Sequence, residues 1–182
     1  RTQDIAREKC VPVVESLKGR GMQCNAGAKA ATGDILLFLH ADTILPNNAF
    51  IVLNRSFQDR DTHIGTFRMK FDLDHHILSF NILCNTYVNC VFIRFGDQCI
   101  TMRRKFFDKI GGFSELEYFE DVELLQKARK LTGIRLFPAT VVTSGRRFKE
   151  QGVARQYFFD AWLMIQYFLG VSPKRLSEKY AN

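Results

Sequence analysis

The sequence contains no Cys-x-x-Cys pair, no Walker loop, no GxGxxG loop and no internal repeat. Its cysteines are odd in number, which argues against a disulfide framework or a zinc site and favours reduced thiols in the cytosol: Cys10, Cys24, Cys84, Cys90 and Cys99. The longest charge-free apolar stretch near the C-terminus, 161–171, is too short to span a bilayer. No nucleic-acid-binding motif is present, so we expect no nucleic-acid partner.

The composition fits one domain over residues 1–182, with 46% hydrophobic and 25% charged residues. The net charge of +7 favours an anionic partner, such as a nucleotide diphosphate or a phospholipid surface. The first residues carry no apolar leader segment, and we expect a cytoplasmic protein, in contact with the membrane at most at its inner face. Alternating strand and helix patterns predict an α/β fold.

A short apolar strand, 34–39, ends at His40 and Asp42. Its composition is typical of a strand that is buried on both faces inside a parallel sheet. Ligands bind at the carboxyl ends of such strands, where Asp42 would hold a divalent cation beside a diphosphate. His40 is a candidate co-ligand that would favour manganese over magnesium. The alternative is an ordinary turn with a hydrogen-bonded imidazole.

Two predicted helices begin at polar or glycine-rich junctions. Gly19, Arg20 and Gly21 open a helix to about residue 31, whose N-terminus and guanidinium suit a phosphate. The alternative is a junction whose glycines allow close packing. Glu120 and Asp121 open an amphipathic helix over 119–131 with Leu124, Leu125, Ala128 and Leu131 on one face. Asp121 is a candidate general base, and ordinary acidic capping is the alternative.

Two further polar segments are candidates for ligand binding. Arg146 and Arg147 follow a Ser-Gly turn and suit a diphosphate, although a solvated basic loop has the same composition. The trio Gly96-Asp97-Gln98 lies between apolar segments and is suited to sugar hydroxyls, or to a turn.

The remaining elements follow from periodicity and turn signals. We expect strands at 11–14, 63–71, 97–102, 134–137 and 141–143. We expect helices at 4–9, 46–57, 75–92, 105–110 and 156–169. The last helix is apolar almost all round, and its large side chains should pack on the sheet or rest at a lipid–water boundary: Tyr157, Phe158, Trp162, Ile165 and Phe168.

Taken in order, the strings GRGMQCNAGAKAATGDILLFLHADT, GDQ, GGF with ED, and TSGRR resemble family-two glycosyltransferases of GT-A fold, closest to a bacterial-type subgroup. The resemblance runs from Thr2 to about Tyr180. It implies a GT-A-like (Rossmann-like) mixed, mainly parallel sheet flanked by helices. It further implies a nucleotide-diphosphate-sugar donor, a divalent metal (Mg or Mn) and inverting transfer to a small-molecule or lipid-linked acceptor.

The resemblance assigns roles residue by residue. Asp42 matches the last Asp of the DxD motif, with His40 in place of the leading Asp, and Asp121 matches the catalytic base. The donor-binding positions are Gly19, Arg20, Asn25, Asp42, Arg146 and Arg147. The acceptor-side positions are Gly96, Asp97 and Gln98.

Two departures from the family pattern matter. The QxxRW motif of processive synthases is absent, so we expect no polymer product. The family's first strand and nucleotide-base-binding segment are also absent, and Thr2 matches the last residue of that segment. Two alternatives remain: a non-catalytic GT-A-like module that binds nucleotide or sugar, and a basic membrane-surface-binding protein.

Overall fold

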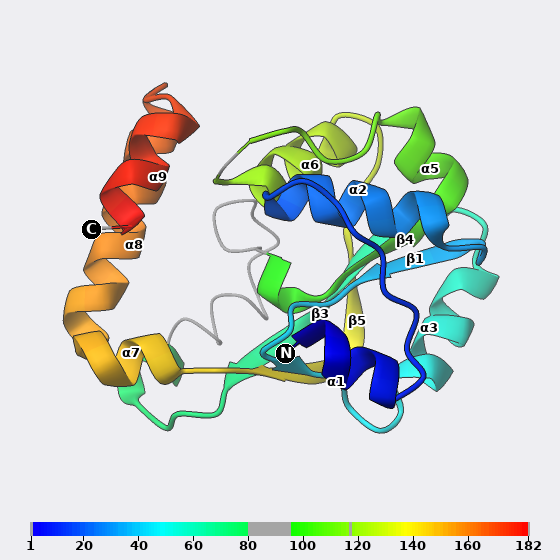
Figure 1. The fold of residues 1–182 in the computed structure, drawn as a ribbon, viewed down its shortest axis with the longest axis horizontal. Helices are drawn as coiled ribbons and strands as arrows, with labels where there is room; N and C mark the ends of the chain where they lie inside the picture. The colour runs from blue at the N-terminus through cyan, green and yellow to red at the C-terminus, as the bar shows by residue number, and fades with distance from the viewer. Residues whose placement is uncertain (1, 80–95, 117, 182) are drawn as a thin grey trace.

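The structure, a computed structural model, describes residues 2–79, 96–116 and 118–181. A five-stranded mixed sheet lies at its centre with helices on both faces (Figure 1). The strands are β1 (Ile35–Phe38), β2 (Thr43–Ile44), β3 (Ile64–Phe71), β4 (Ile100–Arg103) and β5 (Arg135–Thr143). The helices are α1 (Thr2–Glu8), α2 (Arg20–Ala30), α3 (Ala49–Gln58), α5 (Arg104–Lys109), α6 (Glu120–Arg129), α7 (Arg146–Gln151), α8 (Val153–Phe168) and α9 (Pro173–Ala181).

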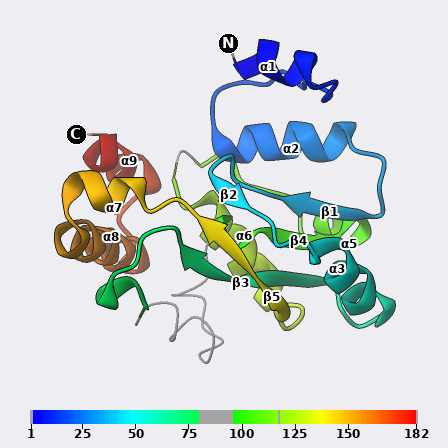
Figure 2. The same cartoon turned by 90° about the horizontal axis from the view of Figure 1, so that it is seen from below.

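The sheet has the order β1-β4-β3-β5-β2. Only the β3–β5 pair among these strands is parallel; β4 runs antiparallel to both neighbours, and β2 runs antiparallel to β5. The expectation of a mainly parallel sheet was therefore wrong for this part of the chain. Strands β1, β3 and β5 nevertheless run in one direction, and their carboxyl ends point toward α7 and α8 (Figure 2).

Among the described strands, β1 lies at one end of the order and pairs with β4. The run of apolar residues in β1 therefore arises because side chains pack on both faces of the strand, and not because its neighbour is a parallel strand. Leu36 packs into the core on one face of the sheet, and Leu37 packs against the core on the other. An apolar sequence reports what covers a strand, and it does not report the direction of the neighbouring strand.

Most predicted elements form within a few residues of their expected bounds. Residues 11–14 form no strand, and their side chains are largely exposed. The two short strands expected at 134–137 and 141–143 are one strand, β5, with an irregular register opposite Phe67 and Arg68. Leu131 is exposed instead of sharing the inward face of α6. The helix expected at 75–92 falls mostly outside the described residues. Within that range the structure describes 75–79, and residues 76–79 are helical.

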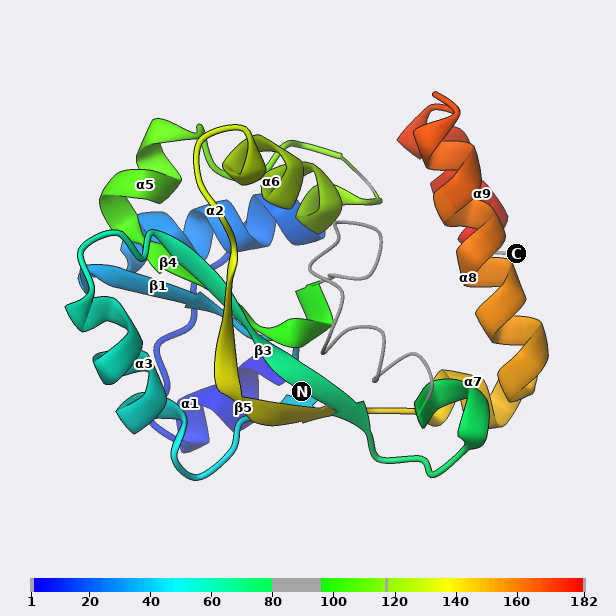
Figure 3. The same cartoon turned by 180° about the vertical axis from the view of Figure 1, so that it is seen from behind.

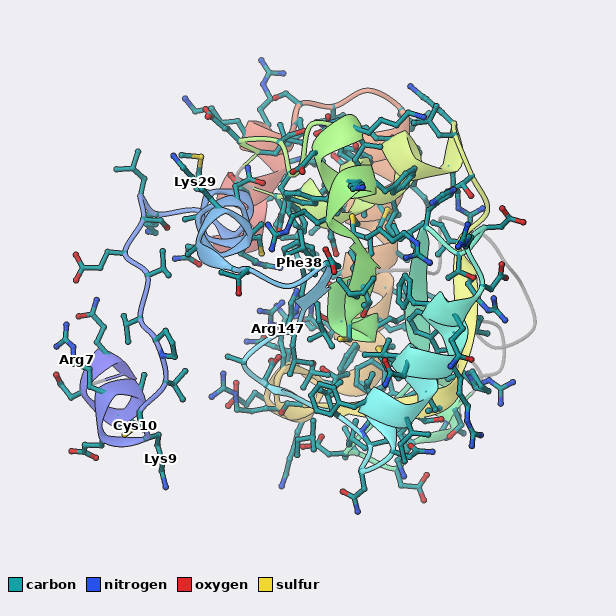
Figure 4. The ribbon with its side chains drawn as sticks, turned by 90° about the vertical axis from the view of Figure 1, so that its right-hand side faces the viewer. Arg7, Lys9, Cys10, Lys29, Phe38 and Arg147 are labelled. Atoms are coloured by element: carbon teal, nitrogen blue, oxygen red, sulfur yellow. The ribbon has the colours of Figure 1, made fainter. Side chains whose placement is uncertain are left out.

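Two core clusters cover the two faces of the sheet. Helices α2, α5 and α6 pack on one face through residues that include Ala28, Phe107 and Leu125. Helix α3 packs on the opposite face through Val52 and Leu53 (Figure 3). In Figure 4, Phe38 lies beneath α2, while α1 with Arg7, and Lys9 and Cys10 just after it, stand apart from the other elements.

Two consecutive arginines close the ends of helices on opposite faces. The Arg103 guanidinium donates hydrogen bonds to three carbonyl groups at the end of α3, those of Phe57, Asp59 and Thr62. The Arg104 guanidinium donates to three at the end of α2, those of Ala28, Ala31 and Gly33. Carbonyl groups at helix ends lack partners within the helix, so these bonds fix both ends.

A third cluster joins α8 and α9 to the beginning of α6. Its buried residues are Phe119, Val122, Leu163, Met164 and Leu176. The large apolar residues of α8 do not all pack inward as a core helix would require: Phe158, Trp162, Ile165 and Phe168 are exposed. No helix in the described part of the chain is both long and apolar enough to cross a bilayer.

Candidate functional site

Charged and polar side chains gather at the carboxyl ends of β1, β3 and β5. The N-terminal ends of α2 and α6 point to the same side of the sheet, and α7 and α8 face it (Figures 1 and 2). Helices α2, α6, α7 and α8 each contribute charged side chains. Further charged side chains come from the loop after β1 and from the 3₁₀ turn Gly96–Gln98. The fold therefore brings together residues separated by more than a hundred positions in the sequence.

His40 and Asp97 form one pair in this region. The two atoms His40 Nδ1 and Asp97 Oδ1 lie 2.7 Å apart. The hydrogen bond to Asp97 raises the pKa of His40 above its ordinary value against the opposing effect of burial, and the Asp121 carboxylate adds to the increase. The hydrogen-bonded imidazole weighed from the sequence is therefore present, and its partner is a residue of the predicted acceptor segment.

Arg20 and Glu120 form a second pair, between the first turns of α2 and α6. Arg20 Nη1 lies 3.7 Å from Glu120 Oε1, and Glu120 is only 3% exposed. Burial raises the pKa of Glu120, the neighbouring Asp121 carboxylate raises it further, and Arg20 opposes both. The arginine beside the glycine turn thus already has a carboxylate neighbour, which orients it across the site.

Asp121 is partly buried at the start of α6, where its Oδ1 accepts a hydrogen bond of 2.8 Å from the Val122 backbone N–H. A helix N-terminus stabilises negative charge. The backbone just before it is strained, since Phe119 has φ 65°. Cys99, which follows Gln98, has φ 55°. Non-glycine residues with positive φ are uncommon and cluster at functional sites.

Helix α8 adds a carboxylate that sequence reasoning missed. Asp160 accepts a 2.8 Å hydrogen bond from Gln156 Nε2, and Gln156 is buried. Burial raises the pKa of Asp160 from 3.8 to about 6, against the effects of Gln156 and Arg147. The nearly all-apolar helix hid these residues, although two polar side chains four positions apart on such a helix are a signal of a shared polar face.

Asp160 makes stability depend on pH. The pKa of about 6 in the folded protein exceeds the ordinary value of 3.8, so the folded state binds the proton more tightly than the unfolded state does. The resulting stabilisation is present below pH 3.8 and is lost as the pH rises to about 6.

We expect Asp160→Asn to raise the melting temperature at pH 7 and to flatten the change of melting temperature with pH between pH 3.8 and about 6. Melting curves across this range check it, with Asp108→Asn, exposed on α5, as the control; equal slopes in all three proteins would contradict it.

Asp42 lies next to the beginning of α7. Its carbonyl oxygen accepts a 3.1 Å hydrogen bond from the Ser144 N–H, and the hydroxyls of Thr43 and Thr143 are 3.0 Å apart. Arg146 and Arg147 are the first residues of α7 instead of a loop. Arg146 is exposed, with Nε 3.9 Å from Glu150 Oε1. Asp42 and the two arginines therefore lie on neighbouring segments at one edge of the sheet.

The other residues predicted to bind donor or acceptor form local hydrogen bonds, a helix N-cap and a 3₁₀ turn in this structure. The Asn25 side-chain amide makes two hydrogen bonds with the Phe113 backbone. Its Nδ2 donates to the Phe113 carbonyl oxygen at 2.8 Å, and its Oδ1 accepts from the Phe113 N–H at 3.0 Å. Gly19 is the N-cap of α2, with φ 140°. Gly96, Asp97 and Gln98 form the 3₁₀ turn, and Gln98 is buried. Their roles toward a ligand stay predictions.

The predicted metal site consists of Asp42 and His40. The residues that the structure describes include no group of three or more His, Cys, Asp or Glu side chains placed to hold a metal ion. His40 Nδ1 is engaged by Asp97.

No protein-family model and no curated protein matches the sequence. Among solved structures, a mycobacterial protein is similar to 76% of the chain, over 46% of its own length, at 16% identity and a TM-score of 0.46. The mannosyltransferase PcManGT from Pyrobaculum calidifontis, solved with GDP-Man and Mn²⁺, is similar to 78% of the chain at 16% identity and a TM-score of 0.50. The chain covers 42% of that protein. Identity this low speaks to architecture alone, and the fold of this chain is accordingly glycosyltransferase-like.

Proposed function

We propose that this chain binds a nucleotide-diphosphate sugar at the carboxyl ends of β1, β3 and β5 and transfers the sugar to an acceptor hydroxyl with inversion. One observation supports this most strongly. The Arg20 guanidinium carbon lies 6.0 Å from the centre of the half-buried Tyr118 ring. Burial is the main cause of the raised pKa of the Tyr118 phenol, and the charges of Arg20, Asp121, Arg147 and Asp160, from four helices, also act on it. A site with cations and carboxylates this close together suits a ligand that has both phosphate and hydroxyl groups.

In this proposal Asp121 is the general base. The acceptor hydroxyl gives its proton to the Asp121 carboxylate while its oxygen bonds to the anomeric carbon. The bond from that carbon to the diphosphate oxygen breaks, and the diphosphate leaves with the electron pair. A single displacement of this kind inverts the anomeric configuration. The position of Asp121 at a helix N-terminus supports the role, because the dipole favours the ionised form that a base requires.

The diphosphate belongs on the basic side of the site. The α2 N-terminus with Gly19 and Arg20 would receive it, and Arg146 and Arg147 would stabilise its negative charge as it leaves. Asn25 would contribute by fixing the end of α2 that receives the donor. The acceptor would lie on the side of Gly96, Asp97 and Gln98. A divalent cation shared by Asp42 and the diphosphate would neutralise charge on the leaving group.

This assignment predicts that metal and nucleotide bind together. One carboxylate beside a diphosphate repels it unless a cation lies between them. We expect calorimetric titration to detect weak Mn²⁺ or Mg²⁺ binding only when GDP or UDP is present. Asp42→Ala should abolish the effect, whereas Asp108→Ala, which removes an exposed carboxylate on α5, should preserve it.

The outcomes separate the possible functions. Tight metal binding without nucleotide, or nucleotide binding indifferent to both metal and Asp42→Ala, would contradict the assignment. Release of the nucleotide diphosphate from a panel of GDP- and UDP-sugars then tests catalysis. Donor binding without release in that panel would favour the non-catalytic binding module over the enzyme.

A further inference from the structure

The outward side of α8 carries a continuous apolar stripe. Phe158, Trp162 and Ile165, with Leu169 at the C-cap, follow one another at intervals of four, three and four residues, which places them on one side of the helix. Their exposed fractions are 69%, 45%, 59% and 79%. We call these four residues the α8 stripe. It is a row of large apolar side chains in contact with water, which a folded protein seldom leaves uncovered.

The opposite side of the helix is already used. Leu163 and Met164 are buried against α6 and α9 in the third core cluster. Helices α8 and α9 form the edge of the molecule beyond the ends of β3 and β5 (Figures 1 and 3). The stripe is therefore held on a packed element and faces away from the protein.

Exposed basic residues precede the stripe on α8 and lie on α9; we call these four residues its basic border. Arg155 lies before it, and Lys174, Arg175 and Lys179 lie on α9, all with exposed side chains. Lys179 Nζ is 4.6 Å from the centre of the Trp162 ring and 2.7 Å from Gln166 Oε1. Among the side chains described on α8 and α9, the one carboxylate is Asp160, which interacts with Arg147 and Gln156 in the candidate site.

We propose that the α8 stripe and its basic border dock this protein on the surface of an anionic lipid bilayer. Apolar side chains would enter the boundary between headgroups and acyl chains, and the lysine and arginine side chains would contact anionic headgroups. Tryptophan favours this boundary because its ring is amphipathic. A second copy of the chain fits this face poorly, since pairing would bring two basic borders together. The proposal stands independently of sugar transfer.

Docking would place the candidate site beside the membrane. Gln156 and Asp160 lie on α8 itself, on the side that faces the site. An acceptor held in the bilayer would then reach the site without leaving the lipid surface.

Trp162 allows a direct test, because it is the only tryptophan of the chain. The full chain is mixed with vesicles of phosphatidylcholine alone or with phosphatidylglycerol added. We expect sedimentation with the anionic vesicles, a blue shift of the Trp162 emission, and quenching by lipids brominated on the acyl chains. The neutral vesicles should bind far less protein, and added salt should weaken binding to the anionic ones.

Matched variants make the test specific. Phe158→Ser/Ile165→Ser removes two stripe residues and should lower vesicle partitioning at least about tenfold. Phe50→Ser/Ile51→Ser removes two residues of α3 that are similarly exposed, at 73% and 57%, and should leave it unchanged. Lys174→Gln/Arg175→Gln should lower it about fivefold per charge. Circular dichroism establishes that each variant is folded.

Three results would overturn the proposal. The first is an absence of binding to anionic vesicles. The second is binding that leaves the Trp162 emission unchanged or that falls equally in the α3 variant. The third is self-association in sedimentation analysis that Phe158→Ser/Ile165→Ser abolishes while vesicles bind nothing, which would assign the stripe to an interface between copies.

Discussion

Replacing Asp121 with asparagine should reduce sugar transfer by roughly a hundredfold or more, the usual effect of losing a general base. The amide keeps the shape of the side chain and can still accept the Val122 N–H bond. It cannot take a proton from the acceptor hydroxyl. Folding and nucleotide binding should therefore remain close to those of the unaltered protein, while the rate of transfer falls.

The neighbouring carboxylate Glu123 provides the matched control. It lies in the same first turn of α6 and has an ion pair with Lys127 at 3.4 Å. Glu123→Gln removes one negative charge from that turn and should leave transfer nearly unchanged. Initial rates at saturating donor, with donor affinity measured by calorimetry, decide the matter. If Asp160→Asn abolished transfer and Asp121→Asn kept full activity, Asp160 on α8 would be the general base instead of Asp121.

The second large effect is expected at Gly21, in the first turn of α2. A Cβ atom added there would overlap the Ser114 carbonyl oxygen, and it would be in van der Waals contact with Phe113 and Glu120. Backbone atoms cannot move aside as a flexible side chain can. We expect Gly21→Ala to lower the free energy of unfolding by about 3 kcal/mol. The melting temperature should fall by roughly 6–12 °C.

Gly27 lies in the same helix and has no atom within 4 Å of an added Cβ. Gly27→Ala should therefore raise stability by up to about 1 kcal/mol, because alanine favours the helical backbone. Opposite signs for two Gly→Ala changes in one helix would isolate close packing as the cause. A destabilisation of similar size at both positions would contradict this account.

Gly21 also shows what the sequence could and could not predict about the glycine-rich junction before α2. The glycine-rich junction was open to two explanations, phosphate binding and close packing. The structure supplies the packing explanation for Gly21, while the position of Arg20 beside Glu120 leaves the ligand role a prediction. Local signals of this kind, the glycine turn before α2 and the apolar periodicity of α6, predicted both helices well because helices depend on nearby residues.

The sheet was predicted less well because strand pairing depends on distant residues. Leu36 pairs with Met102, which lies 66 positions later, and nothing in the β1 sequence specifies that partner or its direction. Asp160 was missed for a related reason. Its role depends on α8 facing the site across the third core cluster, and that packing is set by α6 and α9 as much as by α8.

The Arg104 bonds at the end of α2 affect the geometry at its other end. The helix has 11 residues, so Arg20 lies about 16 Å from the fixed end. A tilt of about 5° there would move the Arg20 end by about 1.4 Å. Misplacement of about 1 Å is enough to slow catalysis a hundredfold. Arg104 at the far end of α2, together with Asn25 and the closely packed Gly21 nearer the site, therefore fixes the position of Arg20, which would contact the phosphate.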